Sequence, residues 1–394
     1  MKFLFKSLHR ILAAVRCSGY SVSESNGNCE DLTRQSDSTA PLPSLLVWSS
    51  PSTKGAGAYQ LWENYRESIS EFVPRVGLLR GHDEEDSFPN PQIKLNRVSL
   101  IWALTDLTRL IKREGSANVV TSISQSDIIF GLFVRRFVRV NWTIYVLGQP
   151  YPVADQTNGL KRHIWKKLWL RAARRADRIV AVSDYIGKII SPEVGNKKID
   201  TVYPSLSNHQ ELFSKIEFTS GSQLRVGFVG RLSPEKDPAL FCSIMDGFEG
   251  VTAKIYGDGP LRPQVEEISQ DVELLGFRPQ EEIYSGLDVL VMTSKSEGLP
   301  MVLVEASHMG IVPLVCDVGG CIEAIHPENR NLLVVPKIDR ENVAVWRARL
   351  RKLQDENLRQ EIRQLQAEWA VSKFDNRKNS QFLASLVIQE ANNA

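Results

Sequence analysis

The chain alternates short apolar runs of β-forming residues with amphipathic helical stretches, and it does so in two successive series. The first series runs through "SLLVWSS", "RVGLLR", "NVVTSIS", "TIYVLGQ" and "DRIVAVS". The second begins at "LRVGFVG" and continues through "VTAKIYG", "VELLG", "LDVLVMTS", "IVPLVC" and "NLLVV". This alternation is typical of parallel sheets covered by helices on both faces. Because 394 residues are too many for one compact core, we predict an α/β protein of two doubly wound domains.

Changes in composition suggest where the domains begin and end. Residues 1–40 are predicted to be an amphipathic segment and a polar linker, residues 41–205 the first domain and residues 206–372 the second. The boundary lies near "TVYPSLSN", where a proline and polar residues interrupt the pattern. From residue 339 the pattern predicts one long charged helix, followed by a shorter one.

Composition excludes several function classes. The 48 Lys and Arg residues nearly balance the 46 Asp and Glu residues, so no overall field attracts nucleic acid. The five cysteines contain no Cys-x-x-Cys pair and the six histidines no His-Glu-x-x-His motif, so we expect neither a disulfide framework nor a metal site. No run reaches the roughly 18 to 20 apolar residues of a membrane span. A cytoplasmic location is the expectation.

Two basic helical segments raise the question of a membrane surface. Residues 2–16, within "MKFLFKSLHRILAAVR", mix apolar and basic residues at helical spacing. Residues 160–176 carry many Lys and Arg residues beside Trp165 and Trp169. Each segment suits either a helix packed on the protein with a charged outer face or a peripheral contact with the inner face of the plasma membrane. Both alternatives remain open at this point.

Candidate ligand-binding residues follow strands of the second series. "VGFVGRLSPEKDP" places Gly230, Arg231 and then Lys236 after one strand, and "IYGDGPLRP" places Gly257 and Gly259 after another. Ligands of open α/β sheets bind at the carboxyl ends of strands. Glycines there allow close backbone approach, and Arg and Lys supply the positive charges that suit a diphosphate.

A third strand is followed by "SKSEGLPMVLVE", which contains two glutamates. Glu297 lies in the loop, and Pro300 is expected at the first position of a helix that contains Glu305. Carboxylates bind vicinal hydroxyls, so one glutamate suits a ribose and the other a sugar, with phosphates at the helix N-terminus between them.

Residues 224–335 resemble the donor-binding domain of the retaining family 4 glycosyltransferases. The resemblance rests on "GFVGRLSPEKDP", "GDGPLR", "LLGFRPQEEIYSGLDVLVMTSKSEGLPMVLVEAS" and "VCDVGGCIEAI". It implies the GT-B fold, in which two Rossmann-like domains face each other. It also implies a C-terminal helix, here residues 373–394, that returns to the first domain.

The resemblance also implies roles for individual residues. Arg231 and Lys236 would contact the donor diphosphate, and Glu297 would bind the transferred sugar; these three are the implied catalytic residues. Glu305 would hold the ribose hydroxyls. The remaining donor-binding positions would line the phosphates, the sugar and, at residues 275–278, the base: Gly230, Gly257, Gly259, Phe277, Arg278, Gly298, Leu299 and Pro300.

The first half matches the family less well. Gly55 and Gly57 in "SPSTKGAGAYQLW" resemble the glycine-rich loop that meets the donor phosphates, and Ser183 resembles a serine at the end of a strand. Many members have a histidine after the strand that matches "TIYVLGQPYP", where this chain has Gly148 and Gln149.

The expected function is that of a nucleotide-sugar-dependent, retaining glycosyltransferase. It would move a sugar from a UDP- or GDP-sugar to a hydroxyl of a glycan or lipid-linked acceptor in cell-surface polysaccharide or glycoconjugate synthesis, without another cofactor. A non-catalytic GT-B scaffold is one alternative. A nicotinamide-dependent oxidoreductase is another, although Gln60 replaces the third glycine of the dinucleotide fingerprint.

Overall fold

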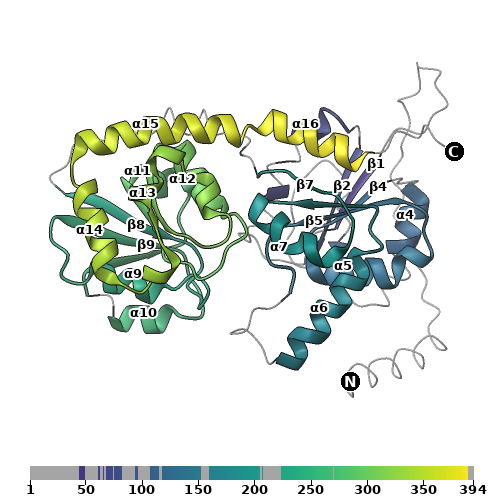
Figure 1. Cartoon of the computed structure of the whole chain (residues 1–394), viewed down its shortest axis with the longest axis horizontal. Coiled ribbons are helices and arrows are strands. Elements are labelled where there is room, and N and C mark those ends of the chain that lie inside the picture. Colours follow the sequence, from purple (N-terminus) through teal and green to yellow (C-terminus); the bar gives the residue numbers. More distant parts are fainter. Residues whose placement is uncertain are drawn as a thin grey trace, which may run out of the picture.

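The computed structural model describes residues 44–48, parts of 61–81, 94–95, 107–114, 118–151, 159–204, 206, 223–268 and 270–388. They form two α/β domains side by side, each built on its own parallel sheet (Figure 1). The two-domain α/β architecture predicted from the sequence is therefore confirmed.

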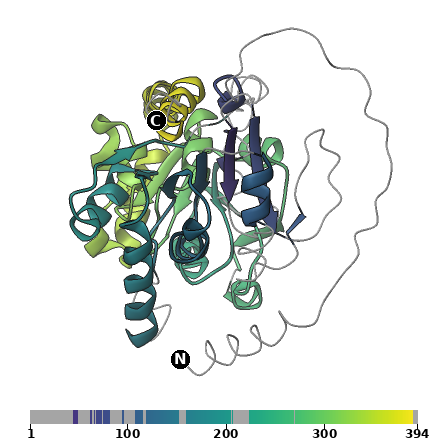
Figure 2. The same cartoon turned by 90° about the vertical axis from the view of Figure 1, so that its right-hand side faces the viewer.

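The first sheet has seven parallel strands in the order β3-β2-β1-β4-β5-β6-β7. Its strands are β1 (Ser44–Trp48), β2 (Arg75–Gly81), β3 (Lys94–Leu95), β4 (Asn118–Thr121), β5 (Asn141–Val146), β6 (Arg178–Ala181) and β7 (Ile199–Thr201). The order reverses beside β1, so the sheet is doubly wound. Figure 2 shows this domain with helices on both sides of the sheet.

The second sheet has six parallel strands in the order β10-β9-β8-β11-β12-β13. They are β8 (Leu224–Val229), β9 (Val251–Tyr256), β10 (Val272–Gly276), β11 (Val289–Met292), β12 (Val312–Cys316) and β13 (Val334–Val335). The order again reverses, beside β8, and the carboxyl ends of β8 and β11 are neighbours.

Burial explains why the strands could be found in the sequence. Every residue of β11 and β12 is buried, because helices cover both faces of the sheet, and such strands are continuous apolar runs. The two edge strands of the first sheet are short and lack such a run. Strands β3 and β7, of two and three residues, were not predicted.

The helices lie on the faces of the two sheets. In the first domain they are α4 (Thr108–Glu114), α5 (Ser124–Leu132), α6 (Gly159–Ala173) and α7 (Asp184–Val194). In the second they are α9 (Pro238–Met245), α10 (Arg262–Ile268), α11 (Gln280–Ser285), α12 (Met301–His308), α13 (Arg330–Leu333), α14 (Val343–Leu353) and α15 (Glu356–Lys373).

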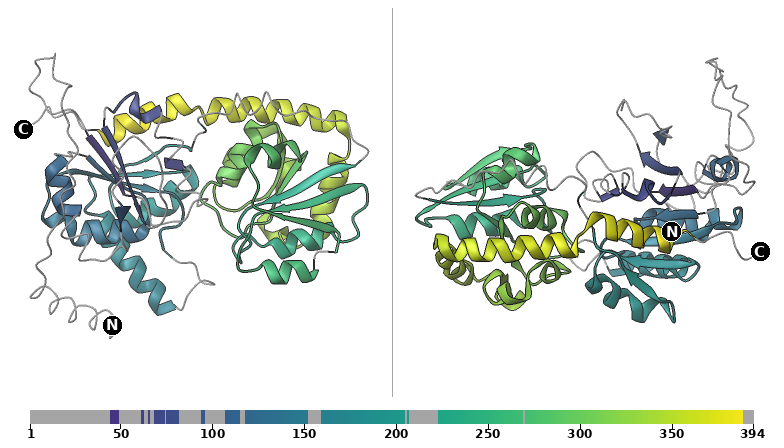
Figure 3. Two further views of the ribbon diagram at one scale, coloured as in Figure 1. Left: turned by 180° about the vertical axis from the view of Figure 1, so that it is seen from behind. Right: turned by 90° about the horizontal axis from the view of Figure 1, so that it is seen from above.

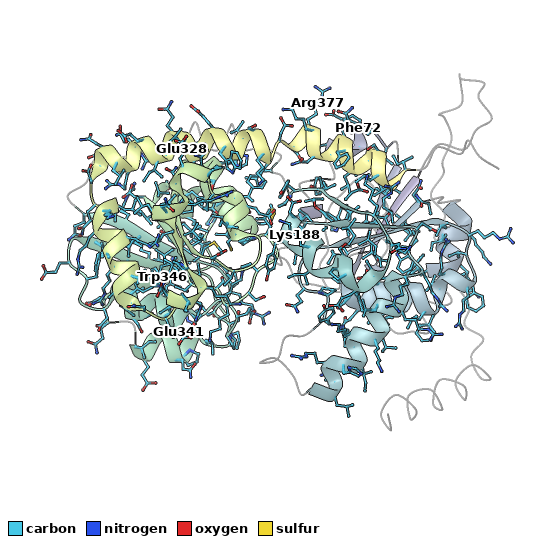
Figure 4. The ribbon with its side chains drawn as sticks, in the orientation of Figure 1. Phe72, Lys188, Glu328, Glu341, Trp346 and Arg377 are labelled. Atoms are coloured by element: carbon cyan, nitrogen blue, oxygen red, sulfur yellow. The ribbon has the colours of Figure 1, made fainter. Side chains whose placement is uncertain are left out.

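The single long helix predicted from residue 339 is wrong, because the chain breaks it in two. Helix α14 ends before Gln354, and Asp355 caps α15 by accepting a hydrogen bond from the backbone N–H of Leu358 at 3.1 Å. Aspartate is a preferred N-cap residue, so the signal was present within the charged run. Trp346 of α14 is buried, and its indole N–H donates to the carbonyl of Arg340 at 2.7 Å (Figure 4).

The last helix, α16 (Asn376–Val387), leaves the second domain and packs on the first (Figure 3). The Ser380 and Ser68 hydroxyls are 2.6 Å apart, and Asn141 donates to the carbonyl of Val387 at 3.1 Å. Figure 4 shows Arg377 and Phe72 together at the outer edge of this contact. The chain end thus ties the two domains together.

Among the described residues, no helix combines the length and the apolar character that crossing a bilayer requires.

Candidate functional site

The carboxyl ends of β8 and β11 bring a lysine and a glutamate together. Lys236 lies in the loop between β8 and α9, and Glu297 lies in the loop between β11 and α12. Lys236 Nζ is 2.6 Å from Glu297 Oε1, and their side chains are 27% and 9% exposed. Residues 61 positions apart in the sequence therefore form one ion pair, which still reaches solvent through Lys236.

A buried network holds the Lys236 loop in place. The Thr293 hydroxyl donates to the backbone carbonyls of Lys236 and Asp237, at 3.1 and 2.8 Å. The buried Arg340 guanidinium pairs with the Asp237 carboxylate and donates to the carbonyl of Thr293. Asp237 has a φ of 52°, an uncommon conformation for a residue with a side chain. Sequence reasoning did not find Thr293 and Arg340, because their role depends on contacts between distant segments.

The second glutamate of the motif has a different environment. Glu305 is 6% exposed, and Tyr284 of α11 donates a hydrogen bond of 2.5 Å to its Oε2. Burial raises the pKa of Glu305, and the Tyr284 hydrogen bond opposes this rise. The phenol fixes one oxygen of the carboxylate. Tyr284 was not singled out from the sequence, although it lies within the segment that resembles the family.

The other sequence-predicted residues of the second domain lie at the ends of its strands. Gly230 follows β8, Gly257 and Gly259 follow β9, and their backbones adjoin: the N–H of Gly230 donates to the carbonyl of Tyr256 at 2.9 Å. Arg231 is exposed beside them.

Phe277 and Arg278 follow β10. The Phe277 side chain is 75% exposed, and the Arg278 guanidinium pairs with the Glu282 carboxylate at 2.9 Å.

Residues 297–300 meet the first domain directly. A Cβ on Gly298 would collide with the carbonyl oxygen of Leu147, which follows β5, so only glycine fits this approach. Ser183, the N-cap residue of α7, donates to the carbonyl of Gly298 at 3.2 Å, and the N–H of Gly320 donates to the same oxygen at 2.8 Å. Leu299 and Pro300 are buried behind this contact. Pro300 is the N-cap residue of α12, one position before its predicted place.

Glu323 makes a second contact between the domains. Its carboxylate accepts hydrogen bonds from the N–H groups of Asp184 and Tyr185, at 3.0 and 2.7 Å, and from the Tyr203 hydroxyl at 2.9 Å. Asp184 and Tyr185 begin α7, where free N–H groups and the positive helix end favour an anion. Burial and Glu323 together raise the pKa of Tyr203. Glu323 was not singled out from the sequence.

The chemistry available at this site follows from its charges. Lys236, Arg231 and the N-terminus of α12 present positive charge at one end of the sheet, which suits a phosphorylated ligand. Glu297 and Glu305 present carboxylate oxygens, which suit hydroxyl groups. Gly55 and Gly57, expected to complete the site from the first domain, lie outside the described residues.

Comparison with known proteins assigns this region. Residues 223–353 match the family model described as "Glycosyl transferases group 1". This part of the chain is therefore similar to the group 1 glycosyltransferases. It contains the Lys236–Glu297 pair, Tyr284 and Glu305.

Two curated relatives illustrate the match to the group 1 glycosyltransferases. The chain is 36% identical over 116 residues to the O-antigen biosynthesis glycosyltransferase WbnH of Escherichia coli, covering 28% of this chain and 33% of that protein. It is 29% identical over 316 residues to the sulfoquinovosyl transferase SQD2 of Arabidopsis thaliana, covering 73% of this chain and 61% of that one. The chain therefore spans about a third of the length of the first curated relatives it matches.

Solved structures with a similar fold cover most of the chain. Sucrose-phosphate synthase from Thermosynechococcus elongatus superimposes with a TM-score of 0.67 at 14% identity, over 87% of this chain and 98% of that one. The structure of Anabaena HepE in complex with UDP-glucose superimposes with a TM-score of 0.66 at 15% identity, over 86% of this chain and 98% of that one. The GT-B fold expected from the resemblance to the family 4 glycosyltransferases is thereby confirmed.

Proposed function

We propose that this chain is a retaining glycosyltransferase that transfers a sugar from a nucleoside diphosphate to a hydroxyl of a glycan or lipid-linked acceptor. The observation that carries the proposal is the Lys236–Glu297 ion pair, which lies before the N-terminus of α12 within the group 1 glycosyltransferase match. The proposed pathway is the synthesis of a cell-surface polysaccharide or glycoconjugate, at the cytoplasmic side of the membrane. The match to an O-antigen biosynthesis enzyme supports this choice.

Lys236 and Arg231 are assigned to the diphosphate. Negative charge on the leaving phosphate grows as the sugar–oxygen bond breaks, and a preorganised cation stabilises this charge without reorganisation. Lys236 is preorganised, since Thr293 fixes the backbone carbonyls of Lys236 and Asp237. The N-terminus of α12 adds backbone N–H groups and a positive helix end.

The two glutamates are assigned to hydroxyl groups. Glu297 lies beside Lys236, so a sugar attached to a phosphate at Lys236 falls within its reach. Glu305 is held by Tyr284 farther along α12, and we assign it to the ribose. Phe277 and Arg278, exposed after β10, are assigned to the base, which we propose to be uracil or guanine.

The acceptor is assigned to the first domain. Leu147 and Gly148 at the end of β5 lie against Gly298, so an acceptor held at this edge would reach the sugar bound by Glu297. Among the described residues, no atom lies within 4 Å of the position that a Cβ on Gly148 would take. Retention of the anomeric configuration would follow if the acceptor attacks from the side on which the phosphate leaves, with that phosphate as the base.

Thermal unfolding with UDP, GDP, ADP or NAD tests the donor site. A nucleotide present at 100 times its dissociation constant adds about 2.7 kcal/mol of stability. We expect a shift with one nucleoside diphosphate and a much smaller shift in Glu305→Ala. A shift with NAD alone would instead support an oxidoreductase. The absence of a shift with all four nucleotides would support a non-catalytic scaffold.

The stereochemistry requires a separate test. With the identified nucleotide-sugar and a hydroxyl acceptor, proton NMR of the anomeric signal during turnover reports the configuration of the product. The same configuration as in the donor supports retention, and inversion would contradict it.

A further inference from the structure

The first part of α6 stands away from the protein body. Helix α6 spans Gly159–Ala173, and all residues from 159 to 164 are exposed. Leu160 and Ile164 are among the exposed large apolar side chains, at 72% and 44%. In Figures 1 and 3 the helix points away from the first sheet, on the side opposite α15 and α16. Nearly two turns of helix therefore present their whole circumference to solvent.

The other side of α6 is firmly packed. Trp169 is buried and its indole N–H donates to the Asp127 carboxylate at 2.8 Å, while Trp165 donates to the Ser124 hydroxyl at 3.3 Å. Helix α5, which contains Ser124 and Asp127, packs along α6. The fold therefore already uses the inner face, and the apolar residues of the outer face have no role in this core.

The outer face combines apolar and basic residues in one stripe. Leu160, Ile164, Lys167 and Arg171 follow one another at spacings of four, three and four residues, and all four are exposed. Such spacing places them on one side of a helix. The apolar pair lies at the projecting end and the basic pair nearer the protein. This arrangement suits an interface with apolar chains below charged headgroups.

The charge of the helix selects the kind of surface. Helix α6 contains five Lys and Arg residues and no Asp or Glu: Lys161, Arg162, Lys166, Lys167 and Arg171. Lys166 pairs with Glu193 at 2.6 Å, whereas Lys167 and Arg171 lie on the outer stripe. Arg174 and Arg175, also exposed, extend the positive charge. We propose that this outer face docks on a bilayer that contains anionic lipids.

The position of α6 links this surface to the acceptor side of the site. Helix α6 follows β5, and the end of β5 at Leu147 touches Gly298 of the second domain. In Figure 1 the free end of α6 points toward the side of the second domain. Docking through this end places the end of β5, at Leu147 and Gly148, to which we assign the acceptor, near the bilayer. This part of the inference rests on the proposed function and specifies that the acceptor is lipid-linked.

Sedimentation with lipid vesicles tests the surface. The full chain is mixed with vesicles of phosphatidylcholine alone or of phosphatidylcholine with phosphatidylglycerol. We expect binding to the anionic vesicles that is at least about tenfold stronger and that weakens with salt. Two double variants should each lower this binding at least about tenfold. One removes the apolar pair, Leu160→Glu/Ile164→Glu, and the other removes the basic pair, Lys167→Glu/Arg171→Glu.

The control variant makes one substitution of each kind on the other domain. Ile338 is 93% exposed and Lys352 is exposed on α14, so Ile338→Glu/Lys352→Glu removes an apolar and a basic side chain elsewhere. It should bind anionic vesicles like the wild type. The melting temperature of each variant and its shift with nucleoside diphosphate show whether the fold and the donor site are intact.

The outcomes separate this inference from the proposed function. Equal binding to both kinds of vesicle, or full binding by both α6 variants, would overturn the docking surface. Lost binding in the α6 variants with an unchanged nucleotide shift supports it. Vesicle binding by a chain that binds no nucleotide would leave the docking surface standing and remove the proposed function, including its lipid-linked acceptor.

Discussion

The two domains place polar side chains at the same point of their folds but use them differently. In the first domain, four polar side chains between the end of β4 and the start of α5 accept hydrogen bonds from indole N–H groups: Trp142 donates to Thr121, Trp62 to Ser122, Trp165 to Ser124 and Trp169 to Asp127. In the second domain the turn from β11 into α12 carries Glu297 and leads to Glu305. Their partners are Lys236, which is 27% exposed, and the Tyr284 phenol.

The difference shows that the end of a strand is not by itself a ligand site. The tryptophans of the first domain bind polar side chains of the β4–α5 turn and tie the turn to the core. The second domain keeps opposite charges at a partly exposed pair, which a charged ligand can separate and bind. The following variants test whether the first turn is structural and the second functional.

The largest expected effect concerns Asp127, which is fully buried. Burial raises its pKa from 3.8 to about 7, a change that corresponds to about 4 kcal/mol. Since the folded state binds this proton more tightly, the contribution of Asp127 to stability is complete below about pH 4 and is lost as the pH rises through about 7. Asp127→Asn should remove this fall and unfold less readily than the wild type at pH 8. Urea unfolding between pH 4 and pH 8 measures it.

Asp246→Asn is the control for Asp127, because it makes the same substitution at an exposed aspartate of the other domain. Equal pH slopes in Asp127→Asn and the wild type would contradict the account of the first domain. A loss of transfer in Asp127→Asn at full stability would show that this turn is functional as well.

Lys236→Ala tests the second turn. We expect kcat to fall about 100-fold to 1000-fold, because an interaction with the growing phosphate charge contributes about 3 to 4 kcal/mol. Arg231→Ala should act in the same direction. Steady-state kinetics with the identified nucleotide-sugar measure both variants, and Lys352→Ala on α14 is the exposed control. A kcat close to that of the wild type in Lys236→Ala would refute its assignment.

Glu323→Ala separates donor binding from transfer. The variant removes three hydrogen bonds between the domains, for a loss of about 1 to 3 kcal/mol. The residues assigned to the donor lie within the second domain, so nucleotide affinity should stay within about twofold while transfer falls about tenfold. Glu328→Ala, an exposed neighbour labelled in Figure 4, should change neither. Equal losses of affinity and transfer would show that Glu323 supports the donor domain itself.

Tyr284→Phe should have the smallest effect. Loss of the hydrogen bond to Glu305 frees the carboxylate to turn, at a cost of about 1 kcal/mol and about fivefold in nucleoside diphosphate affinity. Affinity for pyrophosphate, which lacks a ribose, should not change. Tyr185→Phe, on a partly exposed tyrosine of the first domain, is the control. Weaker pyrophosphate binding in Tyr284→Phe would remove Glu305 from the ribose role.

Much of the second domain could be predicted because its signals are local. Each fully buried strand is a continuous apolar run, and Lys236, Glu297 and Glu305 lie in short segments directly after strands. Thr293, Arg340 and Tyr284 were missed because their roles arise only where distant segments meet. Glu323 was missed for the same reason, since its partners belong to the other domain. The helix break at Asp355 was a local signal hidden within a charged run.

Calorimetric titration of UDP, GDP and ADP into the wild type and Lys236→Ala tests the central claim most directly. We predict that one nucleoside diphosphate binds the wild type and that Lys236→Ala binds it at least about tenfold more weakly. The corresponding nucleoside, which carries no phosphate, should not distinguish the two proteins. Equal affinity of the diphosphate for both proteins, or no binding of any of the three, would contradict a donor site built around Lys236 and Glu297.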